Sequence, residues 1–247
     1  MPQRLKFIVA YDGAAFAGWQ SQLHRKTVQD ELERAFNKIT DAHVRIHGAG
    51  RTDAGVHALA QCAHVDLPDR RLSITRWRSA LNGVLPATIR ILRCHYVASD
   101  FHARLSAKGK TYRYRIWTGP ILPPLEFKRA WHIPAPLDVD LLKAAGKNFV
   151  GRRDFTGFAA NRGKKEENTI RTIRSLEIRR RGSIIKIEIT GDGFLYKMVR
   201  LMVGAMARVA LGKMDPAEIE LRLKSPCHIR GRFTAPAEGL YLVRVWY

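Results

Sequence analysis

The sequence predicts an α+β protein of two similar domains, each a mainly antiparallel sheet with helices on one face, with an active-site cleft between them. Two observations predict this class. Strand patterns of period two alternate with amphipathic helix patterns, and the order strand, helix, strands, helix occurs in both halves of the chain. The length of 247 residues fits one large domain or two domains of about 100–150 residues. We expect the boundary within residues 101–108, which gives domains 1–105 and 106–247.

The first half contains a strand, a helix and further strands. Alternation of Leu5, Phe7, Val9 and Tyr11 with other residues predicts the first strand. Thr27, with Asp30 three residues later, is close to a capping box and predicts a helix N-terminus. The helix stripe is Val28, Leu32, Ala35, Phe36 and Ile39; the elements expected after it are a strand at 59–67, a helix at 75–81 and a strand at 89–98.

The second half repeats this order. Residues 110–117 alternate as a strand does, and Asp138 opens a helix with Leu141, Leu142, Ala145 and Phe149 on one stripe. Strands are expected at 171–180 and 183–190, with a turn at Arg181-Gly182, then a helix at 194–211, a helix starting at Asp215-Pro216 and a last strand at 239–247.

The net charge of +21 is the most unusual property of the composition. Of the 43 Lys and Arg residues, 28 lie in 106–247, interleaved with strand and helix patterns rather than gathered in a tail. A folded surface of this charge indicates a polyanionic partner, either nucleic acid or anionic lipid. The runs Arg152-Arg153, 162–165 and 179–181 are candidate phosphate contacts, although charge runs are usually solvated surface.

Other features narrow the class of protein. No stretch reaches 18 apolar residues, and the N-terminus opens a strand pattern instead of a signal peptide, so we expect a cytoplasmic protein with no membrane segment. Cys62, Cys94 and Cys227 have no CxxC spacing, which favours buried thiols in a reducing compartment over disulfides or a zinc ribbon.

The glycine-rich turn at 47–58 is the most informative segment. Gly48, Gly50 and Gly55 permit tight backbone geometry around Arg51 and Asp53. The turn lacks the GK[ST] ending of a phosphate loop. Asp53 either caps the next segment and pairs with Arg51, or is a carboxylate that Arg51 keeps ionised as a nucleophile or base requires. A metal site of His47, His57 and His64 with Asp53 and Asp66 is a weaker alternative, because the spacing matches no common ligand pattern.

Two residues in the second half are further candidates. Tyr112 lies on a strand among basic residues, which suits base stacking with phosphate contact, although a tyrosine there can also be part of the core. On the helix expected at 194–211, Lys197, Arg200, Gly204 and Arg208 lie opposite the Met/Val stripe. That face either is solvated or lines an RNA-binding cleft.

Taken together, these motifs resemble the tRNA pseudouridine synthase A family. The likeness covers nearly the whole chain, in one order: YDG and FAGWQ (11–20), TVQDELE (27–33), GAGRTDAGVHA (48–58), KTYRYRI (110–116), GRRDFTGF (151–158), GFLYKMVR (193–200) and GLYLVRVWY (239–247).

The resemblance implies an isomerase that converts uridine to pseudouridine at positions 38, 39 and 40 (tRNA numbering) of the anticodon stem-loop. It implies that Asp53 is the essential aspartate, that Tyr112 stacks on the substrate, that Arg51 is the arginine of the same turn and that Arg200 pairs with the aspartate. It also implies a homodimer whose basic clefts hold tRNA.

The chemistry of this reaction suits these residues. The glycosidic bond breaks, the flipped uracil rotates, and C5 bonds to C1′, so no atoms are lost and no cofactor or metal is needed. The residues leave open whether Asp53 attacks C1′, attacks C6 or takes a proton from C2′. Two other function classes also stay open: a non-catalytic RNA-binding protein, and a metal-dependent nuclease that uses Asp53 and nearby histidines.

Overall fold

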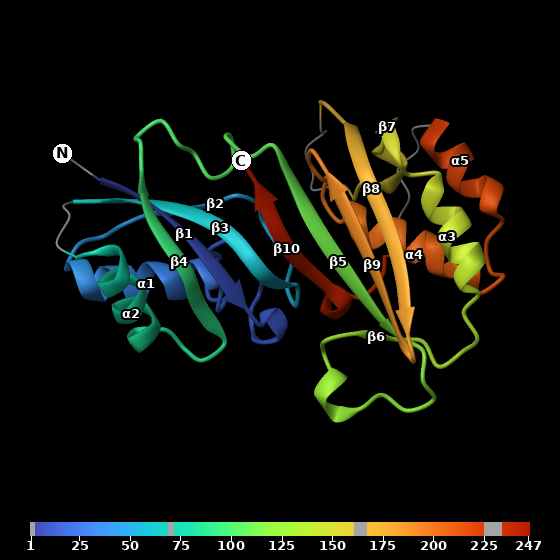
Figure 1. The fold of residues 1–247 in the computed structure, drawn as a ribbon, viewed down its shortest axis with the longest axis horizontal. Helices are drawn as coiled ribbons and strands as arrows, with labels where there is room; N and C mark the ends of the chain where they lie inside the picture. The colour runs from blue at the N-terminus through green and yellow to red at the C-terminus, as the bar shows by residue number, and fades with distance from the viewer. Residues whose placement is uncertain (1–2, 69–71, 161–166, 225–233) are drawn as a thin grey trace. The chain divides into compact units, whose positions relative to one another are not determined.

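The structure is a computed structural model that describes residues 3–68, 72–160, 167–224 and 234–247 (Figure 1). The chain divides into two units, Met1–Lys108 with Tyr241–Tyr247, and Gly109–Leu240. Residues 241–247 at the C-terminus therefore group with the N-terminal residues. The domains expected from the sequence, 1–105 and 106–247, place these residues in the second domain.

The sheet of the first unit is built around β1 (Gln3–Tyr11). It lies between β4 (Ile89–Val97) and β3 (His57–Leu67), and both neighbours are antiparallel to it. Two shorter strands pair with β3: β2 (Ile46–Gly48) is antiparallel to it, and β10 (Leu240–Trp246) is parallel to it. The sequence did not predict β2, because three residues carry too little alternation to be recognised.

Two helices, α1 (Val28–Thr40) and α2 (Ile74–Val84), pack on one face of this sheet (Figure 1). The ring of Phe36 lies 5.4 Å from that of Phe7 on β1 and 5.6 Å from that of Trp77 on α2. The inward side chains of β1 and the stripes of both helices thus form one core. Burial of such apolar surface is the main force that holds the unit together.

The other face of the first sheet is covered by the segment 99–106 and the C-terminal residue. Cys62 and Ala103 lie in a small apolar cluster together with Phe101 and Tyr247. The Tyr247 hydroxyl donates a hydrogen bond of 2.7 Å to the carbonyl of Ala103. This cover anchors the segment that leads into the second unit.

The second unit has an antiparallel sheet of its own. Its strand order is β5 (Gly109–Trp117), β9 (Ile184–Gly191), β8 (Ile170–Arg181) and β7 (Gly151–Asp154). A two-residue strand, β6 (Trp131–His132), pairs with β5 in parallel.

The described part of this unit contains the helices α3 (Val139–Lys147), α4 (Met198–Ala210) and α5 (Pro216–Lys224). A Cβ on Gly146 of α3 would lie 2.8 Å from a methyl of Leu176 on β8 and 3.3 Å from the methyl of Met206 on α4. Helix α3 therefore packs closely on both elements, and a larger residue at Gly146 would require these two side chains to shift. Short 3₁₀ turns occur at Gly13–Ala15, Pro124–Glu126, Thr156–Phe158 and Ala237–Gly239.

Most expected elements are confirmed, as is the α+β class with mixed, mainly antiparallel strands. Thr27 caps α1 by accepting the Asp30 amide, Asp138 caps α3, and Pro216 begins α5. The helix expected from residue 194 was wrong at its start. Helix α4 begins at Met198, because Lys197 adopts a left-handed conformation with φ of 57°.

Two of the three cysteines lie in the described residues. Cys62 and Cys94 are buried thiols, as expected, and burial raises the pKa of both, that of Cys94 to about 11. Cys227 lies outside the described residues. In the parts of the chain that the structure describes, no helix is long and apolar enough to span a bilayer.

Candidate active site

The motif turn joins β2 to β3 and presents Asp53 near its tip. The backbone carbonyl of Asp53 accepts a hydrogen bond of 3.1 Å from the amide of Val56, which closes the turn, and Gly55 has a φ of 79°. Asp53 is half-buried, and Arg51 is exposed. The sequence-predicted carboxylate and arginine therefore lie on the same tight turn, two residues apart.

The segment between β1 and α1 packs against this turn without space between the backbones. A Cβ on Gly13 would lie 2.0 Å from the Val56 carbonyl oxygen, and one on Gly18 would lie 2.6 Å from that of Thr52. Gly18 also has a φ of 99°, which side chains other than glycine rarely adopt. The YDG and FAGWQ motifs thus have a physical task, which is to support the turn that carries Asp53.

Tyr112 lies on β5, on the same face as Tyr114 and Ile116. It is 8% exposed, and its ring meets Phe194 edge-on, with centroids 5.1 Å apart. Tyr112 is therefore part of the buried core, as the alternative interpretation expects. Its predicted role in stacking on the substrate stays a prediction, which requires the ring to become accessible to a base.

Arg200 lies in the first turn of α4 and is half-buried. Its Nε donates a hydrogen bond of 2.7 Å to the carbonyl of Ala235, and its own carbonyl accepts the Ala235 amide at 3.0 Å. The polar face of this helix is narrower than the sequence suggested. Gly204 is buried, and Lys197 precedes the helix, which leaves Arg200 and Arg208 as its only residues that are not buried.

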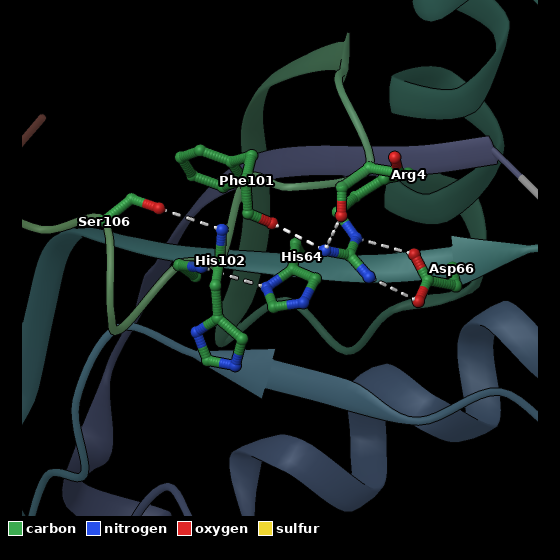
Figure 2. A network of polar contacts seen from close by, with 8 residues as sticks. Arg4, His64, Asp66, Phe101, His102 and Ser106 are labelled. Carbon is green, nitrogen blue, oxygen red and sulfur yellow. Dashed lines mark hydrogen bonds and ion pairs between the residues drawn. The ribbon is translucent and has the colours of Figure 1, made fainter.

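His64 and Asp66 belong to a network of polar contacts with Arg4 and the segment 99–106 (Figure 2). His64 Nδ1 accepts the amide of Ala103 at 3.1 Å, and the ring of His47 stacks on the His64 ring at 5.0 Å. Arg4 makes two hydrogen bonds to Asp66, of 2.7 and 2.8 Å, and donates another of 2.8 Å to the Phe101 carbonyl. These contacts fix the segment 99–106 over the sheet.

The charges of this network follow from its contacts. Burial lowers the pKa of His64 to about 4, so its ring is neutral at pH 7 and can accept the amide. The hydrogen bonds from Arg4 lower the pKa of Asp66.

The residues of the weaker alternative, a metal site, are not gathered in one place. His57 lies elsewhere, with Nδ1 3.1 Å from the Asp12 carboxylate and its ring stacked on Tyr241. Within residues 3–68, 72–160, 167–224 and 234–247, no three His, Cys, Asp or Glu side chains are placed to hold a metal ion.

Comparisons with known proteins identify the family. The family model described as tRNA pseudouridine synthase matches residues 7–105 and 145–247. The tRNA pseudouridine synthase A of Akkermansia muciniphila is 48% identical, over 99% of this chain and 95% of that protein. The enzyme of the same name from Acetivibrio thermocellus is 42% identical, over 99% of this chain and the whole of that protein. The chain belongs to the tRNA pseudouridine synthase A family. It is therefore a tRNA pseudouridine synthase, an isomerase.

One solved structure has weak similarity to this pseudouridine synthase. A chain of a Cbf5-Nop10-Gar1 complex has a TM-score of 0.40 and 14% identity, covering 97% of this chain and 49% of that chain. A likeness at this level does not locate a site.

The four candidate residues of this synthase come from both units. Arg51 and Asp53 belong to Met1–Lys108, and Tyr112 and Arg200 belong to Gly109–Leu240. Two residues that touch the Asp53 turn were missed at the level of sequence, Tyr11 and Gln61. Tyr11 belongs to the quoted YDG motif, which was a usable signal, whereas Gln61 lies inside an ordinary strand and gives none.

Proposed function

We propose that this synthase isomerises uridine at positions 38, 39 and 40 of the tRNA anticodon stem-loop, with Asp53 as its essential residue and with no cofactor or metal. The observation that carries the proposal is the Asp53 turn. A half-buried carboxylate lies on a tight turn that the neighbouring backbone supports at Gly13 and Gly18. A rigid support is what a reacting carboxylate needs, because catalysis depends on its position relative to the sugar and base.

The reaction is balanced without any co-reactant. The N1–C1′ bond breaks, the uracil turns within the pocket, a C5–C1′ bond forms, and the proton on C5 moves to N1. The target nucleotide is stacked in the stem-loop and has to be flipped out before Asp53 can reach it. Asp53 then attacks C1′, attacks C6 or removes a proton from C2′, and the three routes share its ionised carboxylate.

The other candidate residues have supporting roles in this proposal. Tyr112 stacks on the flipped base, and Arg200 or Arg51 holds the Asp53 carboxylate ionised. The cleft between two domains stays part of the proposal, since these residues come from both units.

We further propose that the protein is a homodimer and that it acts on tRNA in the cytoplasm. Light scattering at micromolar concentration tests the homodimer, and a mass near 28 kDa, that of one chain, would contradict it.

One assay separates this function from the two alternatives. An unmodified tRNA transcript is incubated with the protein in EDTA or in Mg²⁺, and pseudouridine and strand cleavage are both measured. We expect pseudouridine at 38–40 in both conditions. No reaction would indicate an RNA-binding protein, and cleavage restricted to the Mg²⁺ sample would indicate a nuclease.

The role of Asp53 is tested in the same assay. Asp53→Asn keeps the size of the side chain but removes its charge, so it should abolish turnover while tRNA binding persists. Asp140→Asn is a matched control, because the Asp140 side chain on α3 is 92% exposed. Turnover by Asp53→Asn well above background would overturn the assignment.

A further inference from the structure

Two buried side chains reach the Asp53 turn from the sheet of the first unit. Tyr11, at the end of β1, is 4% exposed, and its hydroxyl lies 2.8 Å from the hydroxyl of Thr52. Gln61, on β3, is fully buried, and its Nε2 donates a hydrogen bond of 2.7 Å to the carbonyl of Gly50. The two bonds therefore hold the turn at 50 and 52, just before Asp53.

Gln61 is fully buried although burial of its side-chain amide is unfavourable. Its Oε1 is buried and has no hydrogen-bond partner within the described part of the chain. A buried polar atom without a partner lowers stability, and an apolar side chain of similar volume would fill the site without that loss. Packing does not explain this amide, whereas its bond to the Gly50 carbonyl does.

The backbone on the other side of the turn is fixed as well. The Trp19 amide donates to the Thr52 carbonyl at 3.1 Å, and Gly18 leaves no space beside the same oxygen. Thr52 is thus held through both its hydroxyl and its carbonyl. The peptide that joins Thr52 to Asp53 has little freedom to rotate while these contacts persist.

We propose that Tyr11 and Gln61 are positioning residues that fix the Asp53 carboxylate by holding its turn from the sheet side. This inference rests on the proposed role of Asp53. A reacting group displaced by about 1 Å can lose about 100-fold in rate. Binding of tRNA should change little, because it depends on many phosphate contacts rather than on this turn.

The experiment compares Tyr11→Phe and Gln61→Met with the wild type under single-turnover conditions. Tyr11→Phe removes one hydroxyl, and Gln61→Met keeps the length of the side chain without its donor. We expect the rate at saturating enzyme to fall about 10- to 100-fold. The enzyme concentration that gives half the maximal rate should stay within about threefold, the range expected if phosphate contacts are kept.

A second tyrosine of the same unit is the matched control. The Tyr96 hydroxyl accepts from Trp77 Nε1 and donates to the Leu72 carbonyl, both at 3.0 Å. Tyr96→Phe therefore also removes a hydrogen-bonded hydroxyl, but away from the turn. It should keep the wild-type rate, even where its melting temperature falls as much as that of Tyr11→Phe. Equal rates for Tyr11→Phe, Gln61→Met and Tyr96→Phe would overturn the inference.

Asp53→Asn distinguishes failure of the positioning role from failure of the proposed function. If Asp53→Asn is active, the proposed function of Asp53 fails, and the positioning role fails with it. If Asp53→Asn is inactive while both positioning variants keep the wild-type rate, only the positioning role fails.

A double-mutant cycle covers the case in which Gln61→Met does not fold. Tyr11→Phe and Thr52→Val each break the same hydrogen bond, so their effects on the rate should not add. Additive losses would contradict a role that acts through this bond.

Discussion

Tyr112 is a buried residue for which a second role, stacking on the substrate base, is proposed. Its ring packs on Phe194 and is 8% exposed, so Tyr112→Ala would leave a cavity as well as remove the stacking surface. Tyr112→Phe and Tyr112→Leu separate the two effects, because both keep most of the volume.

The first prediction concerns these two variants. Tyr112→Phe keeps an aromatic face and should bind tRNA within about twofold of the wild type. Tyr112→Leu should lose about 1–3 kcal/mol of binding or transition-state free energy, the value of base stacking on an aromatic ring. Filter binding and single-turnover rates measure both. Equal behaviour of Phe, Leu and wild type would assign Tyr112 to the core alone.

The second prediction concerns Arg200. Its guanidinium is oriented by the Ala235 carbonyl. In the proposed function Arg200 pairs with the Asp53 carboxylate, and an arginine beside a carboxylate lowers the pKa of the carboxylate and fixes its rotamer. Arg200→Ala should reduce turnover at least about tenfold, equivalent to about 1.4 kcal/mol, and should change the salt slope of binding by no more than about one phosphate contact.

Arg208→Ala is its control on the same helix, since the Arg208 guanidinium bonds to the Lys213 carbonyl. Turnover within a few-fold of wild type in both variants would favour the solvated-face interpretation of Arg200.

At the scale of elements, the sequence predicted what depends on local chemistry. Thr27 and Asp138 are polar caps before apolar stripes, and both begin helices as expected. The start of α4 was missed because the left-handed conformation of Lys197 leaves no trace in the spacing of apolar residues. The pairing of β10 with β3 was equally unreadable, since it joins residues far apart in the chain.

The candidate site was predictable for a related reason. Asp53 and Arg51 belong to one short, specific motif, so they could be found together. The role of Tyr11 and Gln61, which hold this turn from the sheet, could not be predicted from the sequence. Alternation along β1 places Tyr11 on the inward face, but nothing local says that its partner is Thr52, or that Gln61 bonds to Gly50.

The third prediction tests the packing of β2 against the segment before α1. A Cβ on Gly48 would lie 2.6 Å from the ring of Trp19, which is 2% exposed and has no room to move. Gly48→Ala should destabilise the protein by about 1–3 kcal/mol. Gly83→Ala on α2 meets nothing within 4 Å and should stabilise it by about 0.5–1 kcal/mol. Urea denaturation midpoints measure both shifts, and shifts of the same sign would contradict the prediction.

The fourth prediction concerns the pH dependence of the His64 network. The pKa of His64 is about 4 in the folded protein and about 6.5 when the residue is unfolded, because burial and the positive charge of Arg4 disfavour protonation. Between these values the unfolded chain binds more protons than the folded one. The contribution of His64 to the free energy of unfolding should therefore be fully present above pH 6.5. It should decrease as the pH falls from 6.5 toward 4.

Neighbouring groups and a variant refine this expectation. His102 has a lowered pKa and adds to the same trend, whereas the lowered pKa of Asp66 acts only in more acid solution. His64→Asn can still accept the Ala103 amide and should flatten the dependence between about pH 7 and 5. His43→Asn, at an exposed position, is the control that should not. Identical melting curves for His64→Asn and wild type across this range would contradict the assignment.

At the scale of the whole molecule, charge rather than shape indicates how tRNA is held. The net charge is +21, and basic runs at Arg152-Arg153 and 179–181 are exposed on β7 and β8. The run 162–165 lies outside the described residues. Exposed cations of this kind bind phosphates by releasing counterions, which makes affinity depend on salt.

The fifth prediction follows from this charge. Each phosphate contact adds about 0.7–0.9 to the log–log slope of affinity against salt, so a surface that follows several phosphates should give a slope steeper than about −2. Arg152→Gln with Arg153→Gln, or Arg179→Gln with Arg181→Gln, should reduce that slope by up to about 2 if the pair contacts RNA, while the single-turnover rate at saturation stays unchanged. Asp53→Asn should keep the full slope, because it changes chemistry and not phosphate contacts. A slope near zero for the wild type between low and physiological salt would show that the positive surface does not bind the RNA backbone.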